Sequence, residues 1–445
     1  MTELLFSAIT MPTVSLGKEN PTPDFDSGIL PYTMLDGYGR KREPRSWKAV
    51  ILRNDYIEAL FLPQLGGRLW SLTDRTNGRD LLYNNPEFQP IDRSARNAWV
   101  PGGVEWNCGL AGHSAYTVSP LFAEAIEPES GAPILRMYQY ERVHDLVYQI
   151  SAVLPNDSHH LFVHIRVDNA SARDTTLCWS DCMMVNAEPD TCLLVRARRN
   201  QRKWAASIGA DGYGLIQTST DTLSSRIISE PEQEGAYLTI QAGLTRVVSE
   251  QLPLEGNGKR EWTEAYGSIQ LDPDAVSEDA AEGFLEKALP RARVEAMDAA
   301  LADGLPGQRG RLILKGGGWG SLEQVLRWED FHSQGLRFPS SSMTLEQREW
   351  QDLVFAGALP NRDPSKPPIA IQVSDGWMER VIASIENGMG DHWYSHYMLG
   401  VMYAYRSDSA RAEAAFMRSM ALTPNQWAER CLELLHNTAP ATAIA

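Results

Sequence analysis

The residues best suited to chemistry lie between Trp99 and Pro120, in the stretch WVPGGVEWNCGLAGHSAYTVSP. This stretch brings together a carboxylate (Glu105), an imidazole (His113), an amide (Asn107) and a flat apolar ring (Trp106). Proton-transfer groups beside an aromatic surface are typical of a polar cleft that binds a sugar. The alternative is a glycine-rich loop whose charged groups are only solvated.

Four further patches along the chain combine aromatic side chains with charged or amide groups. In the first, LPQLGGRLWSLTD, Arg68 follows a double glycine. An arginine at that place can fork onto sugar hydroxyls or a carboxylate, or it can hold the rim of a sheet through an ion pair. The other candidates for substrate binding or catalysis are Tyr116, Trp179, Asp181, Gln241, Arg246, Glu250, Trp262, Glu264 and Tyr266.

Two of these carboxylates lie in apolar or aromatic surroundings. Asp181, within CWSDCMM, must be paired or face a cavity, because burying a lone carboxylate is costly. Trp262, Glu264 and Tyr266 alternate onto one face of an apparent strand, so Glu264 is expected to be desolvated. Desolvation raises the pKa of a carboxyl and suits it to general-acid catalysis, although such a face also occurs on ordinary sheets.

These residues suggest two reactions on a mono- or oligosaccharide. A glycoside hydrolase needs two carboxylates on either side of the scissile bond, which Glu105 and Glu264 would supply. An aldose epimerase or mutarotase needs one acid and one base, which His113 and Glu264 would supply. We expect hydrolysis, since mutarotation leaves Glu105 without a chemical task. A non-catalytic carbohydrate-binding protein is the third possibility.

The elements that must position these residues change character along the chain. Residues 45–275 read as successive strands separated by turns, which predicts an antiparallel β-sandwich, and residues 1–44 form an N-terminal extension. Residues 276–390 show helical spacing and are expected to connect the sandwich to a last helical unit at 391–445. KGGGWGS has no P-loop Lys-Ser/Thr after it, so we interpret Gly316–Gly318 as a turn.

The last unit resembles a tetratricopeptide repeat. Leu399-Gly400, Tyr403, Ala412, Phe416 and Pro424 stand at the spaced positions of that family, although His396 replaces a common Trp. A single repeat does not make a stable array, so this helix pair is expected to pack on the rest of the chain.

The ordered blocks LPQLGGRLWSLTDRTNGRDLLYNNP, PGGVEWNCGLAGHS, CWSDCMMVNAEP, GAYLTIQAGLT and EWTEAYG resemble the DUF5107 family, which couples a domain of unknown function to tetratricopeptide repeats. That family lies within the galactose mutarotase-like superfamily. The resemblance implies a β-supersandwich whose concave face binds carbohydrate. It also implies that His113 and Glu264 are the nearest equivalents of the acid and base of mutarotases.

Composition excludes several classes of partner. The chain has 445 residues and a net charge of -16, which argues against nucleic acid and anionic membranes. Five scattered cysteines fit reduced thiols in a cytoplasmic protein, and no ligand spacing calls for a metal or another cofactor. A large sandwich with an exposed helical module is also suited to form a homodimer.

Overall fold

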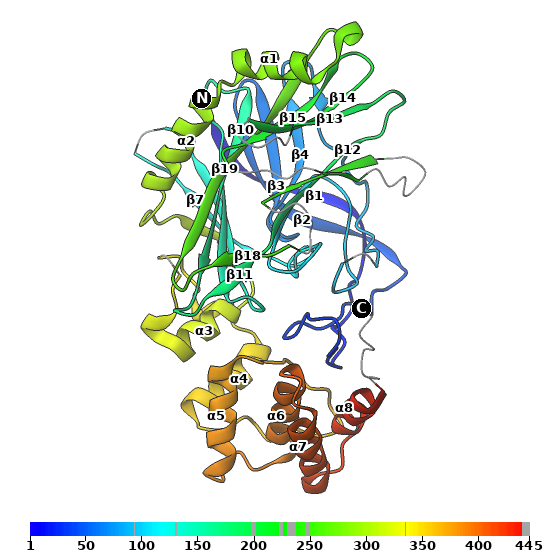
Figure 1. Cartoon of the computed structure of the whole chain (residues 1–445), viewed down its shortest axis with the longest axis vertical. Coiled ribbons are helices and arrows are strands. Elements are labelled where there is room, and N and C mark those ends of the chain that lie inside the picture. Colours follow the sequence, from blue (N-terminus) through cyan, green and yellow to red (C-terminus); the bar gives the residue numbers. More distant parts are fainter. Residues whose placement is uncertain are drawn as a thin grey trace, which may run out of the picture.

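The computed structural model describes residues 1–92, 94–129, 131–196, 202–221, 226–228, 237–244, 250–333 and 335–437. Two nine-stranded antiparallel sheets form the upper part of the molecule in Figure 1, and most of the helices gather at its lower end. This arrangement confirms the predicted β-sandwich with a helical C-terminal region.

The order of the strands across each sheet differs from their order along the chain. Across the first sheet it runs β1 (Glu3–Val14), β2 (Arg42–Arg53), β3 (Ile57–Leu62), β4 (Arg68–Asp74), β6 (Val104–Cys108), β12 (Trp179–Asn186), β17 (Tyr237–Gly243) and β16 (Arg226–Ile228), with β5 (Arg79–Asp80) paired to β4. Across the second sheet it runs β13 (Cys192–Arg196), β14 (Lys203–Ile208), β15 (Tyr213–Ser219), β19 (Lys259–Gln270), β10 (His160–Asn169), β9 (Leu146–Val153), β8 (Ile134–Glu141), β7 (Phe122–Ile126) and β20 (Arg311–Leu314). Two short strands, β11 (Thr175–Leu177) and β18 (Leu252–Leu254), form a separate ribbon.

The main core lies between the two sheets and follows from the alternation of apolar side chains along the strands. In β10, Leu161, Val163, Ile165 and Val167 point to the inner face and are fully buried, as their spacing predicts. Phe162, on the opposite face of the same strand, belongs to a second apolar cluster that α1 and α2 cover. The second sheet is therefore buried on both faces.

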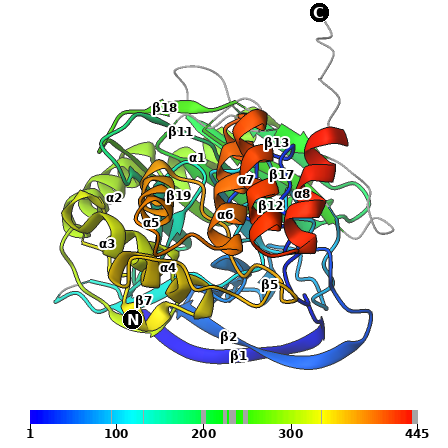
Figure 2. The same cartoon turned by 90° about the horizontal axis from the view of Figure 1, so that it is seen from below.

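The helices follow the strands in the chain. They are α1 (Glu278–Ala288), α2 (Arg291–Gly304), α3 (Trp319–Arg327), α4 (Leu345–Phe355), α5 (Asp375–Glu386), α6 (Trp393–Tyr405), α7 (Ser409–Leu422) and α8 (Gln426–Asn437). Helices α4 to α8 form a compact group beyond one end of the sandwich (Figures 1 and 2). Within the described ranges, no helix combines the length and the apolar character that crossing a bilayer requires.

The C-terminal helices pack as the tetratricopeptide-like spacing predicts. Gly400 of α6 faces the ring of Phe416 on α7, and a Cβ atom at Gly400 would lie 2.5 Å from that ring. Ala412 is completely buried in the same interface. Two small residues thus allow the two helices to approach closely.

Two segments join the sheets although their sequences suggest otherwise. Residues 3–14, within the expected extension, form β1 and pair along their whole length with β2. Residues 311–314, within the expected helical connector, form β20 and pair with β7 at the edge of the second sheet. Both are edge strands. A long loop separates β1 from β2, and β20 lies far from β7 in the sequence, so local patterns do not indicate either pairing.

Candidate functional site

Strand β6 carries the central residues of the candidate site and sends its side chains alternately to the two faces of the first sheet. Trp106 points into the core between the sheets. Glu105 and Asn107 therefore point to the outer face, together with Cys182, which is opposite Glu105 in the neighbouring strand β12. Gly103, just before β6, has φ +68°, and a Cβ there would meet the Leu69 carbonyl oxygen at 2.1 Å. This close turn sets the position of the strand.

Four side chains surround the carboxylate of Glu105. Its Oε2 accepts hydrogen bonds from Trp99 Nε1 (2.8 Å) and from His113 Nδ1 (2.8 Å). Its Oε1 accepts from the Thr117 hydroxyl, and Arg68 lies 3.5 Å from the same oxygen. Glu105 is only 3% exposed, whereas the side chain of His113 is 18% exposed and reaches the surface. The imidazole is thus the accessible member of this cluster.

The surroundings of Glu105 fix both its charge and the tautomer of His113. Burial by itself would raise the pKa of Glu105, but the charges of His113 and Arg68 and the hydrogen bonds from His113 and Thr117 lower it to about 2. An ionised carboxylate only accepts hydrogen bonds, so Nδ1 of His113 must carry the proton. In the neutral imidazole, Nε2 is then left with a free lone pair and can act as a base.

Glu105, His113 and Cys182 could also hold a metal ion, since their ligand atoms lie within 4.8 Å of one another. Burial raises the pKa of the Cys182 thiol well above its usual range, and the neighbouring Glu105 carboxylate adds to this effect. A metal-binding cysteine must be a thiolate, and Arg68 already supplies a positive charge at Glu105. These donors fit a hydrogen-bonded Glu-His pair better than a metal centre.

A second pair of acidic residues, Asp181 and Glu264, lies inside the sandwich, where both are fully buried. Glu264 accepts hydrogen bonds from Trp262 Nε1 (2.9 Å), the Tyr266 hydroxyl (2.5 Å) and Trp106 Nε1 (3.4 Å). Burial raises the pKa of both carboxyls, and the charge of Glu264 raises that of Asp181 further. Asp181 therefore favours its protonated form beside the Glu264 carboxylate.

The site predicted from the sequence splits into three groups, and this corrects the predicted cleft. Arg68, Glu105, Asn107, His113 and Gln241 lie on the outer face of the first sheet. Trp106, Trp179, Asp181, Trp262, Glu264 and Tyr266 fill the sandwich interior instead of lining a cleft. Tyr116 faces a cavity at the lower end of the sandwich, Glu250 is exposed outside the strands, and Arg246 is outside the described residues.

Consequently, Glu105 and Glu264 do not face each other. Glu105 points to the outer face of the first sheet, whereas Glu264, on β19 of the second sheet, lies between the sheets and bonds to the inward-pointing Trp106. The predicted pairing of His113 with Glu264 fails for the same reason. Arg68 and Asn107 form hydrogen bonds within the protein: Arg68 donates to the carbonyls of Val100 and Gly102, and Asn107 accepts from the Ser114 amide.

Trp99, Thr117 and Cys182 belong to the cluster although the sequence motifs did not predict them. Trp99 and Thr117 lie within the same glycine-rich stretch as Glu105, and each donates a side-chain hydrogen bond to its carboxylate. Hydrogen-bond donors this near to Glu105 in the sequence could have been predicted as its partners. Cys182 is adjacent to Asp181, so strand alternation places it on the opposite face. Its approach to Glu105 depends on the register between β6 and β12, which no local pattern specifies.

Fold and site together define a two-sheet β-sandwich with an outward-facing Glu-His pair and a helical C-terminal region. Residues 25–196 match the family model described as "Domain of unknown function (DUF5107)", which confirms the resemblance seen in the motifs. The blocks GAYLTIQAGLT and EWTEAYG lie beyond the matched residues.

Solved structures match the chain to different extents. A TPR-domain containing protein from Parabacteroides distasonis matches 98% of this chain and 82% of its own chain, with a TM-score of 0.59 and 15% identity. The likeness covers the sandwich and the helices together and shows the fold. A galactose mutarotase-like protein from Clostridium acetobutylicum matches 51% of this chain and 96% of its own (TM-score 0.37, 9% identity). A galactose mutarotase related enzyme from Lactobacillus acidophilus matches 52% and 99% (TM-score 0.37, 9% identity).

Proposed function

We propose that the protein is a carbohydrate-active enzyme that interconverts the anomers of an aldose, with His113 as the catalytic acid and base. The observation that carries the proposal is the bond between His113 Nδ1 and the ionised Glu105, which leaves Nε2 of a partly exposed imidazole as the proton acceptor when the ring is neutral and as the donor when it is protonated. The motif resemblance to the galactose mutarotase-like superfamily supports an aldose as the substrate class. The buried Trp99 ring, 4.7 Å from the His113 ring, packs against the imidazole and helps to fix its orientation.

The reaction breaks and re-forms the bond between C1 and the ring oxygen, with one proton moving between the two oxygens. Nε2 of His113 takes the proton from the C1 hydroxyl as that bond breaks, and the resulting imidazolium gives this proton to the ring oxygen, which yields the open-chain aldehyde. After rotation about the bond between C1 and C2, Nε2 takes the proton back as the ring closes on the other face and delivers it to the new C1 hydroxyl. Glu105 holds the imidazole in the correct tautomer and stabilises the imidazolium that forms transiently.

The hydrolase prediction needs Glu105 and Glu264 as the general acid and the second catalytic carboxylate, and neither residue is suited to these roles. A general acid needs a raised pKa, whereas that of Glu105 is lowered to about 2. Glu264 has a raised pKa but is enclosed between the sheets. The geometry therefore favours the epimerase hypothesis over two-carboxylate hydrolysis.

The test compares variants of the two residues in the Glu-His pair. His113→Asn should abolish the exchange of α- and β-anomers of glucose and galactose, followed by polarimetry and by NMR exchange spectroscopy. Glu105→Gln should lower kcat by about a hundredfold or more, because the imidazole loses the group that fixes its tautomer.

Asp181→Asn, which alters only the interior pair, is the matched control and should leave the rate unchanged. Water addition to oligosaccharides, read by mass, would instead favour hydrolysis. Sugar binding without turnover of any tested aldose would indicate a binding protein and would contradict the proposal.

A further inference from the structure

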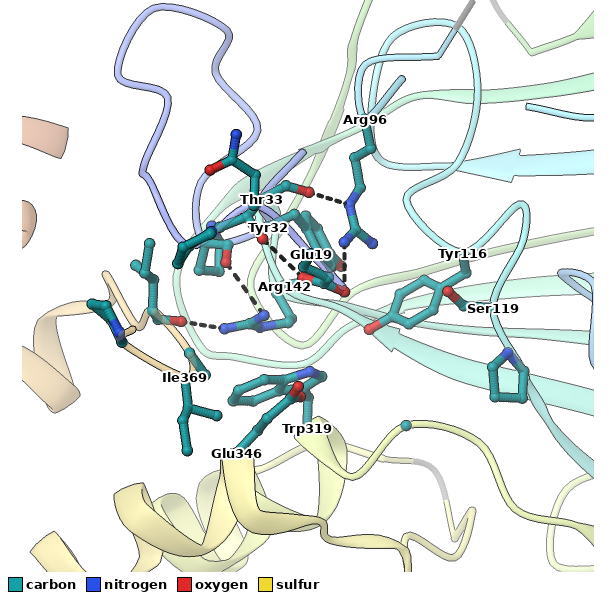
Figure 3. Close-up of a pocket in the computed structure, with 18 residues that line it drawn as sticks. Glu19, Tyr32, Thr33, Arg96, Tyr116, Ser119, Arg142, Trp319, Glu346 and Ile369 are labelled. Carbon is teal, nitrogen blue, oxygen red and sulfur yellow. Dashed lines mark hydrogen bonds and ion pairs between the residues drawn. The ribbon is translucent and has the colours of Figure 1, made fainter. Parts of the chain in front are cut away.

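A cavity of about 180 Å³ lies where the N-terminal segment, the sandwich and the helical region meet (Figure 3). Its volume corresponds to about six water molecules at liquid density, which is the size of a small organic molecule. Parts of the chain far apart in sequence contribute to its wall, and these include Glu19, Tyr32, Arg96, Arg142, Trp319 and Glu346. The cavity therefore exists only when the helical region is docked on the sandwich.

Arg142 is the cation of this cavity that lacks a counterion. Its guanidinium donates to three neutral oxygens, the carbonyls of Pro31 and Ile371 and the side-chain amide of Gln372. Its Nε is buried without a hydrogen-bond partner, and in the described part of the chain no carboxylate lies within ion-pairing distance of it. The Trp319 ring packs 3.6 Å from the guanidinium carbon. A largely enclosed cation without a counterion is costly, so an anion at this place would be favoured.

The other arginine of the cavity is already paired. Arg96 forms an ion pair with Glu19 (2.7 Å) and donates to the carbonyl oxygens of Thr33 and Ala115. Glu346 borders the cavity as well. Burial and the charge of Glu19 raise the pKa of its carboxyl, and the charge of Arg142 opposes them to a smaller extent. One unpaired positive charge near two acidic groups accommodates a single negative charge and disfavours a dianion.

We propose that this cavity binds a small organic monocarboxylate, whose carboxylate pairs with Arg142 and whose body packs against Trp319 and Tyr32. Figure 3 shows Arg142 between the loop that carries Tyr32 and the residues Trp319 and Glu346 of the helical region. A ligand held there contacts both parts of the molecule and stabilises their docking. This cavity lies away from the Glu105–His113 pair, and the proposal does not depend on the proposed catalytic activity.

The test uses defined probes on the full chain. Acetate, lactate and gluconate are titrated by isothermal titration calorimetry, with lactamide as the uncharged counterpart of lactate and glycerol 3-phosphate as a dianion. At least one monocarboxylate should bind and raise the melting temperature. Arg142→Gln should weaken that binding by about tenfold to a hundredfold, as expected when a charge-assisted pair is lost. Arg348→Gln, at an exposed arginine on α4, should bind like the wild type.

Each other result overturns the proposal. These results are binding of none of the monocarboxylates, equal binding of lactamide and lactate, or tighter binding of glycerol 3-phosphate than of every monocarboxylate. Arg142→Lys guards against misfolding, because it keeps the charge and should bind more tightly than Arg142→Gln. If Arg142→Gln and Arg142→Lys both unfold cooperatively and bind the carboxylate equally weakly, the positive charge is not what binds the anion.

Discussion

At the scale of single residues, the environment rather than the residue type decides what each carboxyl group can do. Four donors keep Glu105 ionised and turn it into an orienting group for His113. Aromatic neighbours predict desolvation of Glu264, and burial does raise its pKa. The complete burial of this carboxyl could not be predicted from the sequence, because it depends on how the first sheet packs over β19.

Asp181→Asn should make stability less sensitive to alkaline pH. Because the pKa values of Asp181 and Glu264 are raised in the fold, the folded chain keeps a proton that the unfolded chain releases above about pH 4. The free energy of unfolding therefore falls with rising pH, by about 1.4 kcal/mol per pH unit for one proton, until the folded pair titrates. The isosteric amide removes this proton while still accepting from Trp179 Nε1.

Urea denaturation between pH 4 and pH 9 checks this prediction. The variant should match the wild type near pH 4 and exceed its stability at pH 8. Parallel pH profiles would mean that Asp181 is not protonated in the fold.

At the scale of elements, alternation predicts which side chains share a face but not which face is buried. Trp262, Glu264 and Tyr266 do share one face of β19, as their spacing predicts. That face turns inward because β19 lies in the middle of the second sheet, between β15 and β10. The pairing of β6 with β12 is a long-range contact across more than 70 residues, so the Glu105 cluster could be predicted only in part.

Two glycines in helices should respond to alanine with opposite signs. Gly283→Ala in α1 meets nothing within 4 Å and should stabilise the protein by about 0.5–1 kcal/mol, through its helix propensity. Gly400→Ala in α6 should destabilise it by about 1–3 kcal/mol, because its methyl group would overlap the Phe416 ring. Thermal denaturation monitored by circular dichroism compares the two variants. A stabilising Gly400→Ala would mean that α6 and α7 are packed less tightly than the structure shows.

At the scale of the whole molecule, the helical region and the N-terminal segment pack against the sandwich and form part of one structure with it. Residues between β1 and β2, such as Glu19 and Tyr32, line the same cavity as Trp319 and Glu346 of the helical region. Composition and periodicity predict the sandwich and the helices, because each is a local pattern. Their docking could not be predicted, since it depends on single contacts such as that between Arg142 and the Ile371 carbonyl.

The ion pairs that cross this interface should differ in strength according to their exposure. Arg327, at the end of α3, forms two hydrogen bonds of 2.7 Å with Asp145 of the sandwich, and the side chains are 18% and 27% exposed. Arg173 pairs with Asp375 of α5 across the same interface, but these side chains are 71% and 53% exposed. We expect Arg327→Met to destabilise the protein by about 1–3 kcal/mol, because it leaves Asp145 half-buried and unpaired.

Arg173→Met is the matched control and should change stability by less than about 0.5 kcal/mol, since solvent and salt screen an exposed pair. Scanning calorimetry of both variants, at low salt and at high salt, measures the difference. If docking of the helical region holds the molecule together, Arg327→Met should also separate the unfolding of the helices from that of the sandwich into two transitions. Changes of less than about 0.5 kcal/mol for both substitutions would show that neither pair contributes to docking, which would leave the apolar contacts around α3 as its source.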